Sequence, residues 1–167
     1  MITVREKPED FDDWPELLDL LQESYAYMDS RIDPPSSLHR LDARSLAEKS
    51  RDEILILALE DKELAGCCFV KPAGDVLYVG KLAINPARQG QGIGRKLIDF
   101  STRVAQQKGC EALELETRIE LVENHRAFSA MGFRKTAETA HRGYNRPTSI
   151  TMRMELSANA DRPKPTT

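Results

Sequence analysis

The clearest chemical feature of this chain is the glycine-rich run at residues 89–94, where two of three glycines precede the helix-like stretch from Ile93 to Lys108. The run follows an apolar, strand-like stretch from Val76 to Ile84. Glycine lets the backbone bend sharply and lets another molecule approach the main chain closely. A helix that begins at such a bend directs unpaired N–H groups and its positive dipole end into it. This geometry suits an anion, and we expect it to bind the pyrophosphate of a cofactor.

A dinucleotide-binding fold is the alternative use of such a turn, and the pattern argues against it. That fingerprint lies near the first strand of its domain and is followed by several strand–helix units. Here the glycines lie in the middle of the chain, and their spacing fits neither G-x-G-x-x-G nor the Walker pattern. Glu114, about twenty residues further on, is the one feature that imitates the ribose-binding acid of the fingerprint.

Length and composition favour one globular domain at residues 1–156 and a flexible tail at residues 157–167, where Asn, Asp, Pro and Thr dominate. The formal net charge of -3, with no basic run, argues against a nucleic-acid partner. No apolar run is long enough to span a bilayer, and no leader-like segment begins the chain. The three cysteines show neither metal spacing nor a disulfide framework, so we expect reduced thiols and a cytoplasmic protein.

Hydrophobic periodicity predicts a mixed order of elements. Four helices are expected, at residues 11–28, 42–49, 93–108 and 121–131, and Asp42 is the predicted N-cap of the second. Seven strands are expected, at residues 2–6, 53–59, 64–70, 76–84, 112–117, 133–140 and 149–156. The chain therefore begins with antiparallel hairpins and ends in strand–helix–strand units, which indicates an α+β fold.

Residues 82–94, Leu-Ala-Ile-Asn-Pro-Ala-Arg-Gln-Gly-Gln-Gly-Ile-Gly, resemble the acetyl-CoA motif of the GNAT superfamily of N-acetyltransferases. The family pattern Gln/Arg-x-x-Gly-x-Gly/Ala falls on Gln89, Gly92 and Gly94. Residues 127–133, Ala-Phe-Ser-Ala-Met-Gly-Phe, resemble the second family motif, a helix that closes with an aromatic residue before Gly-Phe. The resemblance covers residues 1–156 in element order. It implies a mostly antiparallel, twisted sheet of six to seven strands, splayed at the cofactor site and flanked by about four helices.

The resemblance also implies a set of residues that bind acetyl-CoA. The pyrophosphate is expected at the main chain of Gln89, Gly90, Gln91, Gly92, Ile93, Gly94 and Arg95. The pantetheine arm is expected to pair like an extra strand with Leu82, Ala83 and Ile84, while Asn124 and Phe128 of the second motif contact it. The Leu82 N–H is expected to polarise the thioester carbonyl. Side-chain packing of Leu82 and Ile84 in the core is compatible with this role.

Direct acetyl transfer needs an unprotonated amine and a proton for the departing thiolate. The family often supplies that proton from a tyrosine, but the matching position here is Phe128. Tyr144, in the late loop, is a candidate for the missing acid. The remaining candidates for acid or base are Glu116, His125 and Tyr78, each of which has an ordinary structural alternative as a surface, helix or packed strand residue.

The resemblance places acceptor selectivity in the first two helices and the loop between them. Tyr25 and Arg31 lie there, and Arg31 together with Arg142 or Arg146 is predicted to bind a carboxylate of the acceptor. We therefore expect an acetyl-CoA-dependent enzyme that acetylates a primary amine of a small molecule or peptide by direct attack, with no metal. The alternatives are a non-catalytic acyl-CoA-binding module and a protein N-terminal or lysine acetyltransferase. The resemblance also makes a homodimer possible.

Overall fold

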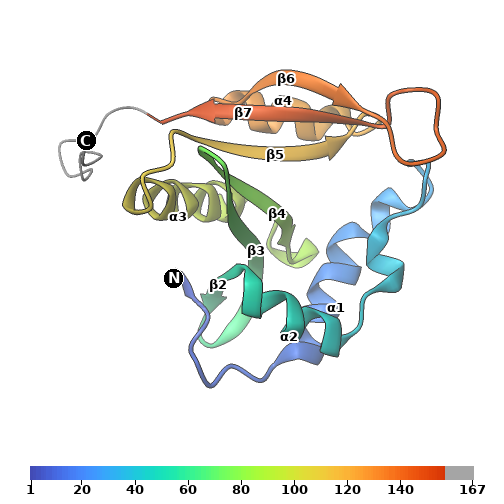
Figure 1. The fold of residues 1–167 in the computed structure, drawn as a ribbon. Helices are drawn as coiled ribbons and strands as arrows, with labels where there is room; N and C mark the ends of the chain where they lie inside the picture. Colours follow the sequence, from blue (N-terminus) through green and yellow to red (C-terminus); the bar gives the residue numbers. More distant parts are fainter. Residues whose placement is uncertain (157–167) are drawn as a thin grey trace.

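The computed structural model describes residues 1–156, so the predicted tail at residues 157–167 lies outside the described part. One sheet contains the strands β1 (Ile2–Glu6), β2 (Ile54–Glu60), β3 (Glu63–Ala73), β4 (Val76–Ile84), β5 (Ala112–Arg118), β6 (Arg134–Thr139) and β7 (Ser149–Glu155). Their order in the sheet is β1-β2-β3-β4-β5-β7-β6 (Figure 1). Neighbouring strands are antiparallel except β4 and β5, which are parallel. The predicted α+β fold with a mostly antiparallel sheet is confirmed.

Four α-helices accompany the sheet in the described residues: α1 (Trp14–Tyr25), α2 (Ala43–Asp52), α3 (Ile93–Gln107) and α4 (Val122–Met131). Pro15 stands in the first turn of α1, where a missing N–H costs no helical hydrogen bond. Asp42 caps α2 as predicted, because its carboxylate accepts from the Ser45 N–H at 2.7 Å and the Ser45 hydroxyl accepts from the Asp42 N–H at 3.0 Å. The predicted helix at residues 11–28 is shorter than expected and ends in a 3-10 turn, Ala26–Met28.

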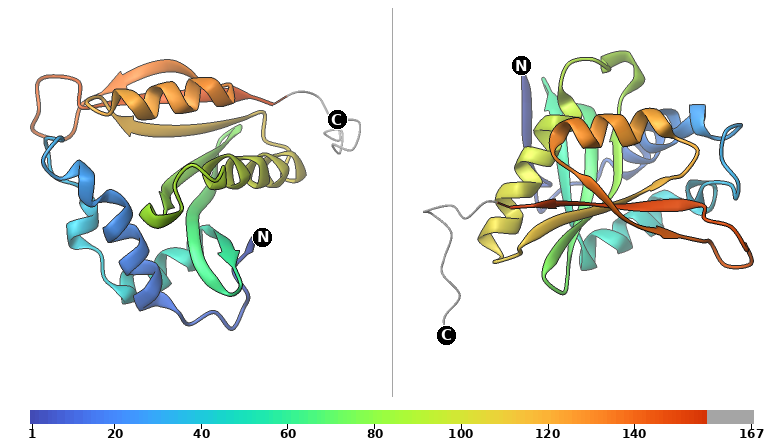
Figure 2. Two further views of the ribbon diagram at one scale, coloured as in Figure 1. Left: turned by 180° about the vertical axis from the view of Figure 1, so that it is seen from behind. Right: turned by 90° about the horizontal axis from the view of Figure 1, so that it is seen from above.

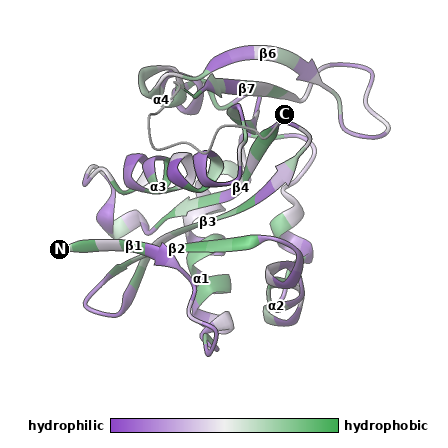
Figure 3. Ribbon diagram, turned by 60° about the vertical axis from the view of Figure 1, so that its left-hand side comes forward, coloured by the Kyte–Doolittle hydropathy of each residue, from purple (hydrophilic) through white to green (hydrophobic). Residues whose placement is uncertain are grey.

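The central strands are buried on both faces, which explains why β2 and β3 are almost continuously apolar in sequence. Leu55 and Leu57 of β2 pack in one core cluster with α1 and α2, whereas Ile56 and Ala58 pack in the other cluster with α3. The neighbouring Cys67 and Cys68 are likewise buried on opposite faces. Figure 3 shows the hydrophobic β2 and β3 between more hydrophilic outer elements such as α2 and β6.

The two halves of the sheet diverge between β4 and β5. These strands pair only through Val76–Ala112, Leu77–Leu113 and Tyr78–Glu114, and beyond this point each continues without the other. Figure 2 shows β5, β7, β6 and α4 as one layer that leans away from the layer containing β3, β4 and α3. The splay that the family resemblance implied is therefore present, and it opens at the carboxyl end of β4, directly before the glycine-rich run.

A β-bulge in β4 directs the end of this strand toward the opening. The register with β3 shifts between Cys67 and Phe69, and Lys81, in the bulge, has a positive φ of 52°. Positive φ is uncommon for a residue with a side chain and marks local strain. The sequence did not predict this bulge. None of the helices formed by residues 1–156 is long and apolar enough to cross a membrane.

The close packing of α3 on β3 makes Gly66 a test of the fold. A Cβ atom there would lie 2.9 Å from the Ala83 carbonyl oxygen and 3.0 Å from Ile93 Cγ2. We expect Gly66→Ala to lower the free energy of unfolding by about 1–3 kcal/mol, because the core is overpacked. Gly80→Ala is the matched control in the same strand pair, since its Cβ would meet the Tyr78 ring at an ordinary 3.5 Å. Urea denaturation measures both, and equal stability of the two variants would contradict the prediction.

Candidate active site

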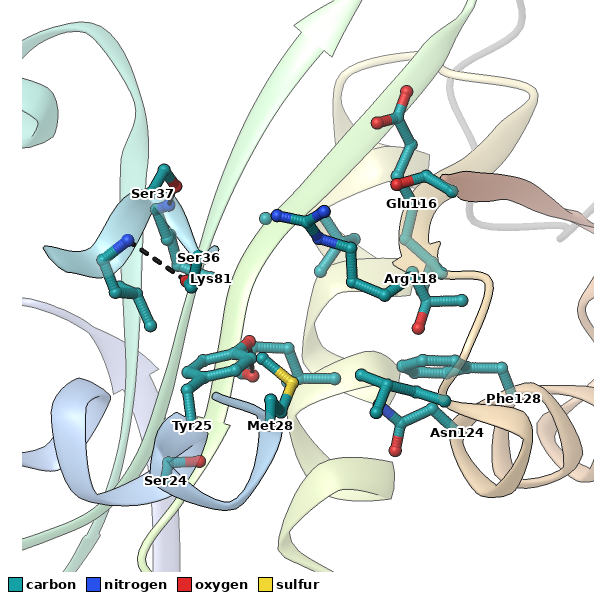
Figure 4. Close-up of a pocket in the computed structure, with 18 of the residues that line it drawn as sticks. Ser24, Tyr25, Met28, Ser36, Ser37, Lys81, Glu116, Arg118, Asn124 and Phe128 are labelled. Carbon is teal, nitrogen blue, oxygen red and sulfur yellow. Dashed lines mark hydrogen bonds between the residues drawn. The ribbon is translucent and has the colours of Figure 1, made fainter. Parts of the chain in front are cut away.

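A cavity of about 700 Å³ fills the opening between the two halves of the sheet. Its walls come from the end of α1, the segment before α2, β4, β5, α4 and the loop between β6 and β7. Figure 4 shows Tyr25, Met28 and Lys81 on one side of it and Arg118, Asn124 and Phe128 on the other. Segments far apart in sequence therefore meet around one hollow. The glycine-rich run reaches the same cavity through Gln89.

The glycine-rich run is an open cradle at the start of α3. Gly90 and Gly92 have positive φ angles of 82° and 76°, and nothing lies within 4 Å of a Cβ added at either position. Gly92 is the N-cap residue of α3 and provides no side-chain cap, so the first amides of the helix are not capped by the chain itself. The loop is held from behind, where the Arg88 guanidinium forms ion pairs with Glu60 and Glu63. Arg95 is exposed in the first turn of α3.

The end of β4 is held in the opening by two side chains of α1. The Tyr25 hydroxyl donates a hydrogen bond to the Leu82 carbonyl, and the Ile84 N–H donates to the Ser24 hydroxyl at 3.1 Å. The Asn85 N–H, in contrast, donates to the Ala65 carbonyl of β3 at 2.8 Å. Because hydrogen bonding alternates along an antiparallel strand, Leu82 and Ile84 face away from β3 and into the opening. Burial raises the pKa of the Tyr25 hydroxyl above its ordinary value, so this group is a fixed donor.

Glu116 and Tyr78, two of the predicted acid or base candidates, both line the cavity. Tyr78 is half-buried, and burial together with the charges of Glu116 and Glu114 raises its pKa to about 12. A hydroxyl with so high a pKa stays protonated at neutral pH and gives up its proton reluctantly. Glu116 is exposed at its position on β5.

The Tyr144 ring also lines the cavity, but its hydroxyl already has a partner. It donates to Asp33 Oδ1 at 2.7 Å, and this bond raises the pKa of Tyr144. Arg146 contacts the other Asp33 oxygen at 3.0 Å and lies over the Tyr144 ring. The three residues therefore tie the β6–β7 loop to the segment between α1 and α2, a contact visible at the right of Figure 1.

His125 lies outside the cavity lining, unlike the other candidates for proton transfer. Its Nε2 donates to the Arg118 carbonyl at 2.9 Å, so the ring holds the end of β5 against α4. Asn124 and Phe128 of the same helix do line the cavity. The half-buried Phe128 ring packs edge-on against Phe133, with ring centroids 5.7 Å apart. The Phe128 ring forms an apolar wall of the cavity and cannot donate a proton.

The predicted acceptor-binding arginines are separated by the structure. Arg31 forms a two-pronged ion pair with Glu123 of α4, one contact of which measures 3.0 Å, and this pair lowers the pKa of Glu123 to about 2. Arg146 is paired with Asp33. Arg142 and Tyr25 line the cavity, whereas Arg31 and Arg146 are not part of its lining.

The cavity residues that were not proposed from the sequence include Ser24, Lys81, Arg118 and His141. Ser24 looked like an ordinary helix residue, and His141 like part of a plain turn. Lys81 and Arg118 lie in strands, where polar and apolar side chains normally alternate, so their neighbours in the sequence gave no sign of a role in the site. Only the folded chain shows that all four line one cavity. Burial and the nearby Arg118 charge lower the pKa of His141.

The model of the acetyltransferase (GNAT) family matches residues 14–133 of this chain. The chain belongs to this family. It is therefore an N-acetyltransferase that uses acetyl-CoA, as the sequence motifs predicted. The open cradle at Gly90 and Gly92 and the adjoining cavity fit such a cofactor, because they leave room beside uncapped amides.

Solved acetyltransferases share the fold across nearly the whole chain. The ribosomal-protein-S18-alanine N-acetyltransferase from Escherichia coli has a TM-score of 0.70 at 16% identity, with 98% of this chain and 99% of that chain covered. The PaiA N-acetyltransferase from Thermoplasma acidophilum, in complex with coenzyme A, has a TM-score of 0.77 at 16% identity, covering 93% and 99%. A GNAT acetyltransferase from Elizabethkingia anophelis with acetyl-CoA bound has a TM-score of 0.67 at 21% identity, covering 93% and 98%.

The hydrogen bond from Tyr25 to β4 yields a prediction for this acetyltransferase. Tyr25→Phe removes the donor to the Leu82 carbonyl, so we expect the free energy of unfolding to fall by roughly 1–2 kcal/mol. Tyr27→Phe is the control, since Tyr27 lies two residues further along the chain and is 46% exposed. Chemical denaturation compares the two variants. A Tyr25→Phe protein as stable as the control would show that the hydrogen bond does not hold β4.

Proposed function

We propose that the enzyme transfers the acetyl group of acetyl-CoA directly to the primary amine of a small molecule, and that residues 1–156 carry this activity as one domain. The observation that carries the proposal is the cavity in the sheet opening, which the glycine-rich run reaches through Gln89 and whose walls come from both halves of the sheet. One end suits a phosphate-bearing cofactor and the other a compact acceptor.

We propose that the main chain from Gln89 to Arg95 holds the pyrophosphate of the cofactor. Support comes from the uncapped N-terminus of α3 and from the free space at Gly90 and Gly92. The positive end of the helix dipole and the Arg95 side chain favour the anion there. Residues 82–84 and the helix face with Asn124 and Phe128 then line the path of the pantetheine arm.

The Leu82 N–H is proposed as the donor to the acyl oxygen, where negative charge develops during transfer. Its support is geometric. In an extended residue the N–H and C=O groups point to the same side, and the Leu82 carbonyl meets Tyr25 in the opening. Because the Ile84 N–H is taken by Ser24, the Leu82 N–H is the main-chain donor at this end of β4 that no α1 side chain contacts.

Glu116 and His141 are proposed to accept the proton of the incoming ammonium group. An alkyl ammonium has an ordinary pKa of about 10.4, so a neighbouring base must remove its proton near neutrality. The lowered pKa of His141 keeps its imidazole neutral and able to accept a proton. Tyr78 lies in the same cavity and is positioned to relay through water. Tyr144 stays a predicted acid for the thiolate, although it must first leave Asp33.

The acceptor end of the cavity favours a small molecule over a folded protein. The Asp33 contacts with Tyr144 and Arg146 join the segment before α2 to the β6–β7 loop, and the Arg31–Glu123 pair joins it to α4. The Asp33 N–H also donates to Glu120 at 3.1 Å. We infer that these contacts restrict the approach of a protein chain to the cavity.

Binding of the pyrophosphate at the start of α3 predicts that a negative charge at position 92 weakens the binding of coenzyme A. Gly92→Asp places a carboxylate at the N-cap of α3, where it caps the helix but repels the pyrophosphate. We expect the Kd for coenzyme A to rise about tenfold or more, which corresponds to about 1.4 kcal/mol. Gly92→Asn has the same shape without the charge and is the matched control. Calorimetric titration with coenzyme A at low and high salt tests this, and equal affinity of the two variants would count against the proposed grip.

Direct transfer and a small acceptor can be tested together. We expect thiol release from acetyl-CoA with small primary amines, and little with peptides that present a free N-terminus or a lysine. We also expect no exchange of acetyl between acetyl-CoA and isotopically labelled coenzyme A when amine is absent, because direct attack forms no acetyl-enzyme. Rapid exchange would overturn direct transfer, and preference for peptides would overturn the small acceptor.

A further inference from the structure

The acceptor end of the cavity is positively charged, although the whole chain has a net charge of -3. Among the described residues that line the cavity, one is a carboxylate, Glu116, and four are cations, namely Arg40, Lys81, Arg118 and Arg142. These cations come from the segment before α2, from β4, from the end of β5 and from the β6–β7 loop. Lys81 and Arg118 lie on opposite sides of the cavity (Figure 4). A pocket of this kind attracts an anionic group.

Arg118 is the most unusual of these cations, because part of its guanidinium is buried without a partner. Its Nη1 atom is buried and makes no hydrogen bond within the described residues, while Nη2 donates to the Pro35 carbonyl at 3.2 Å. Figure 4 shows the side chain reaching from β5 across the pocket toward Ser36, Ser37 and Lys81. His125 fixes the main chain behind it. The guanidinium is thus held in place with one nitrogen unused.

No carboxylate of the described residues accepts a hydrogen bond from Arg118 Nη1. Glu120 attracts Arg118 electrostatically, but one of its oxygens accepts from the Asp33 N–H and the other makes no hydrogen bond. Glu120 is also outside the cavity lining. Burial lowers the pKa of Arg118, yet arginine remains charged at neutral pH because its ordinary pKa exceeds 12. A buried N–H group without an acceptor is costly, and an acceptor from outside the chain would remove that cost at Nη1.

Lys81 approaches the same space from the opposite wall. Its ammonium group donates to the Ser37 hydroxyl at 3.0 Å and has no carboxylate within ion-pair distance among residues 1–156. Burial and the neighbouring Lys49 charge lower its pKa. The strained backbone of the β4 bulge aims this residue, which directly precedes Leu82. A group bound between Lys81 and Arg118 therefore lies close to the proposed point of transfer.

We propose that the acceptor amine carries a carboxylate, which binds between Arg118 and Lys81. This inference rests on the proposed function and names its substrate class. The sequence pointed to Arg31 with Arg142 or Arg146 for this role, but Arg31 and Arg146 already hold carboxylates of the chain. Arg118 has a buried N–H group without an acceptor, and a carboxylate matches it better than any neutral group because charged hydrogen bonds are the stronger ones. The acceptor is accordingly an amino acid or a similar small amino carboxylate.

The test compares amines that differ only in this group. The twenty common amino acids and their carboxamides are offered with acetyl-CoA, and thiol release is measured. We expect kcat/KM for an accepted acid to exceed that of its amide by roughly 10- to 100-fold, as expected for a charged hydrogen-bonded pair. Arg118→Gln and Lys81→Gln should each remove most of this preference, because KM for the acid rises far more than KM for the amide. Arg118→Lys keeps the positive charge but lacks the paired N–H groups of a guanidinium, so this variant should retain part of the preference for the acid.

Binding provides a second measurement that does not depend on turnover. With coenzyme A saturating, the accepted acid should raise the Tm of the wild-type protein and of the control Arg126→Gln, an exposed arginine of α4, but not of Arg118→Gln. An acid-to-amide ratio unchanged in Arg118→Gln would overturn the inference alone, as would preference for 2-aminoethyl phosphate over every amino acid. If neither acids nor amides are acetylated while coenzyme A still binds, the proposed small acceptor fails, and the inference fails with it.

Discussion

The functional architecture depends on the point at which β4 and β5 stop pairing. Beyond Tyr78 and Glu114, two neighbouring strands of one sheet continue with main-chain groups that no strand satisfies. Unpaired buried groups of this kind cost about 1–3 kcal/mol each. The chain offsets part of this cost with Tyr25 and Ser24, which bind the Leu82 carbonyl and the Ile84 N–H. The groups that remain are the ones that a strand-like ligand can satisfy.

The opening persists because each half of the sheet has its own support. On one side α1 and α2 cover β2 to β4, and on the other Phe128 and Met131 of α4 pack on the core that β5, β7 and α3 share. The bulge at Lys81 bends the end of β4 away from a regular ladder. At the acceptor end, the contacts of Asp33 with the β6–β7 loop tie the two halves together again. Contacts between side chains therefore link the two walls of the cavity at this end.

Much of this fold follows from local sequence patterns. The periodicity of residues 93–108, the Asp42 cap and the glycines before α3 each predicted an element that the structure contains. The partners of exposed charges did not follow, because they come from distant segments: Tyr144 and Asp33 are 111 residues apart, and Arg31 and Glu123 are 92. Local reasoning therefore favoured Arg31 and missed Arg118, whose strand position looks ordinary until the sheet opens beside it.

The same positive charge that suits a carboxylate bears on the missing acid at Phe128. A unit charge about 7 Å away, at an effective dielectric of about 20, contributes roughly 2 kcal/mol. A bound acceptor carboxylate offsets one of the charges of Lys81, Arg118 and Arg142, and the remaining positive charge favours both the neutral form of the amine and an anionic leaving group. A positioned acid typically contributes about 10²- to 10⁴-fold, which corresponds to roughly 3–5 kcal/mol. Electrostatic stabilisation of the leaving group by a cationic cavity is of similar size, so this enzyme has a physical route to transfer that needs no tyrosine in the second motif.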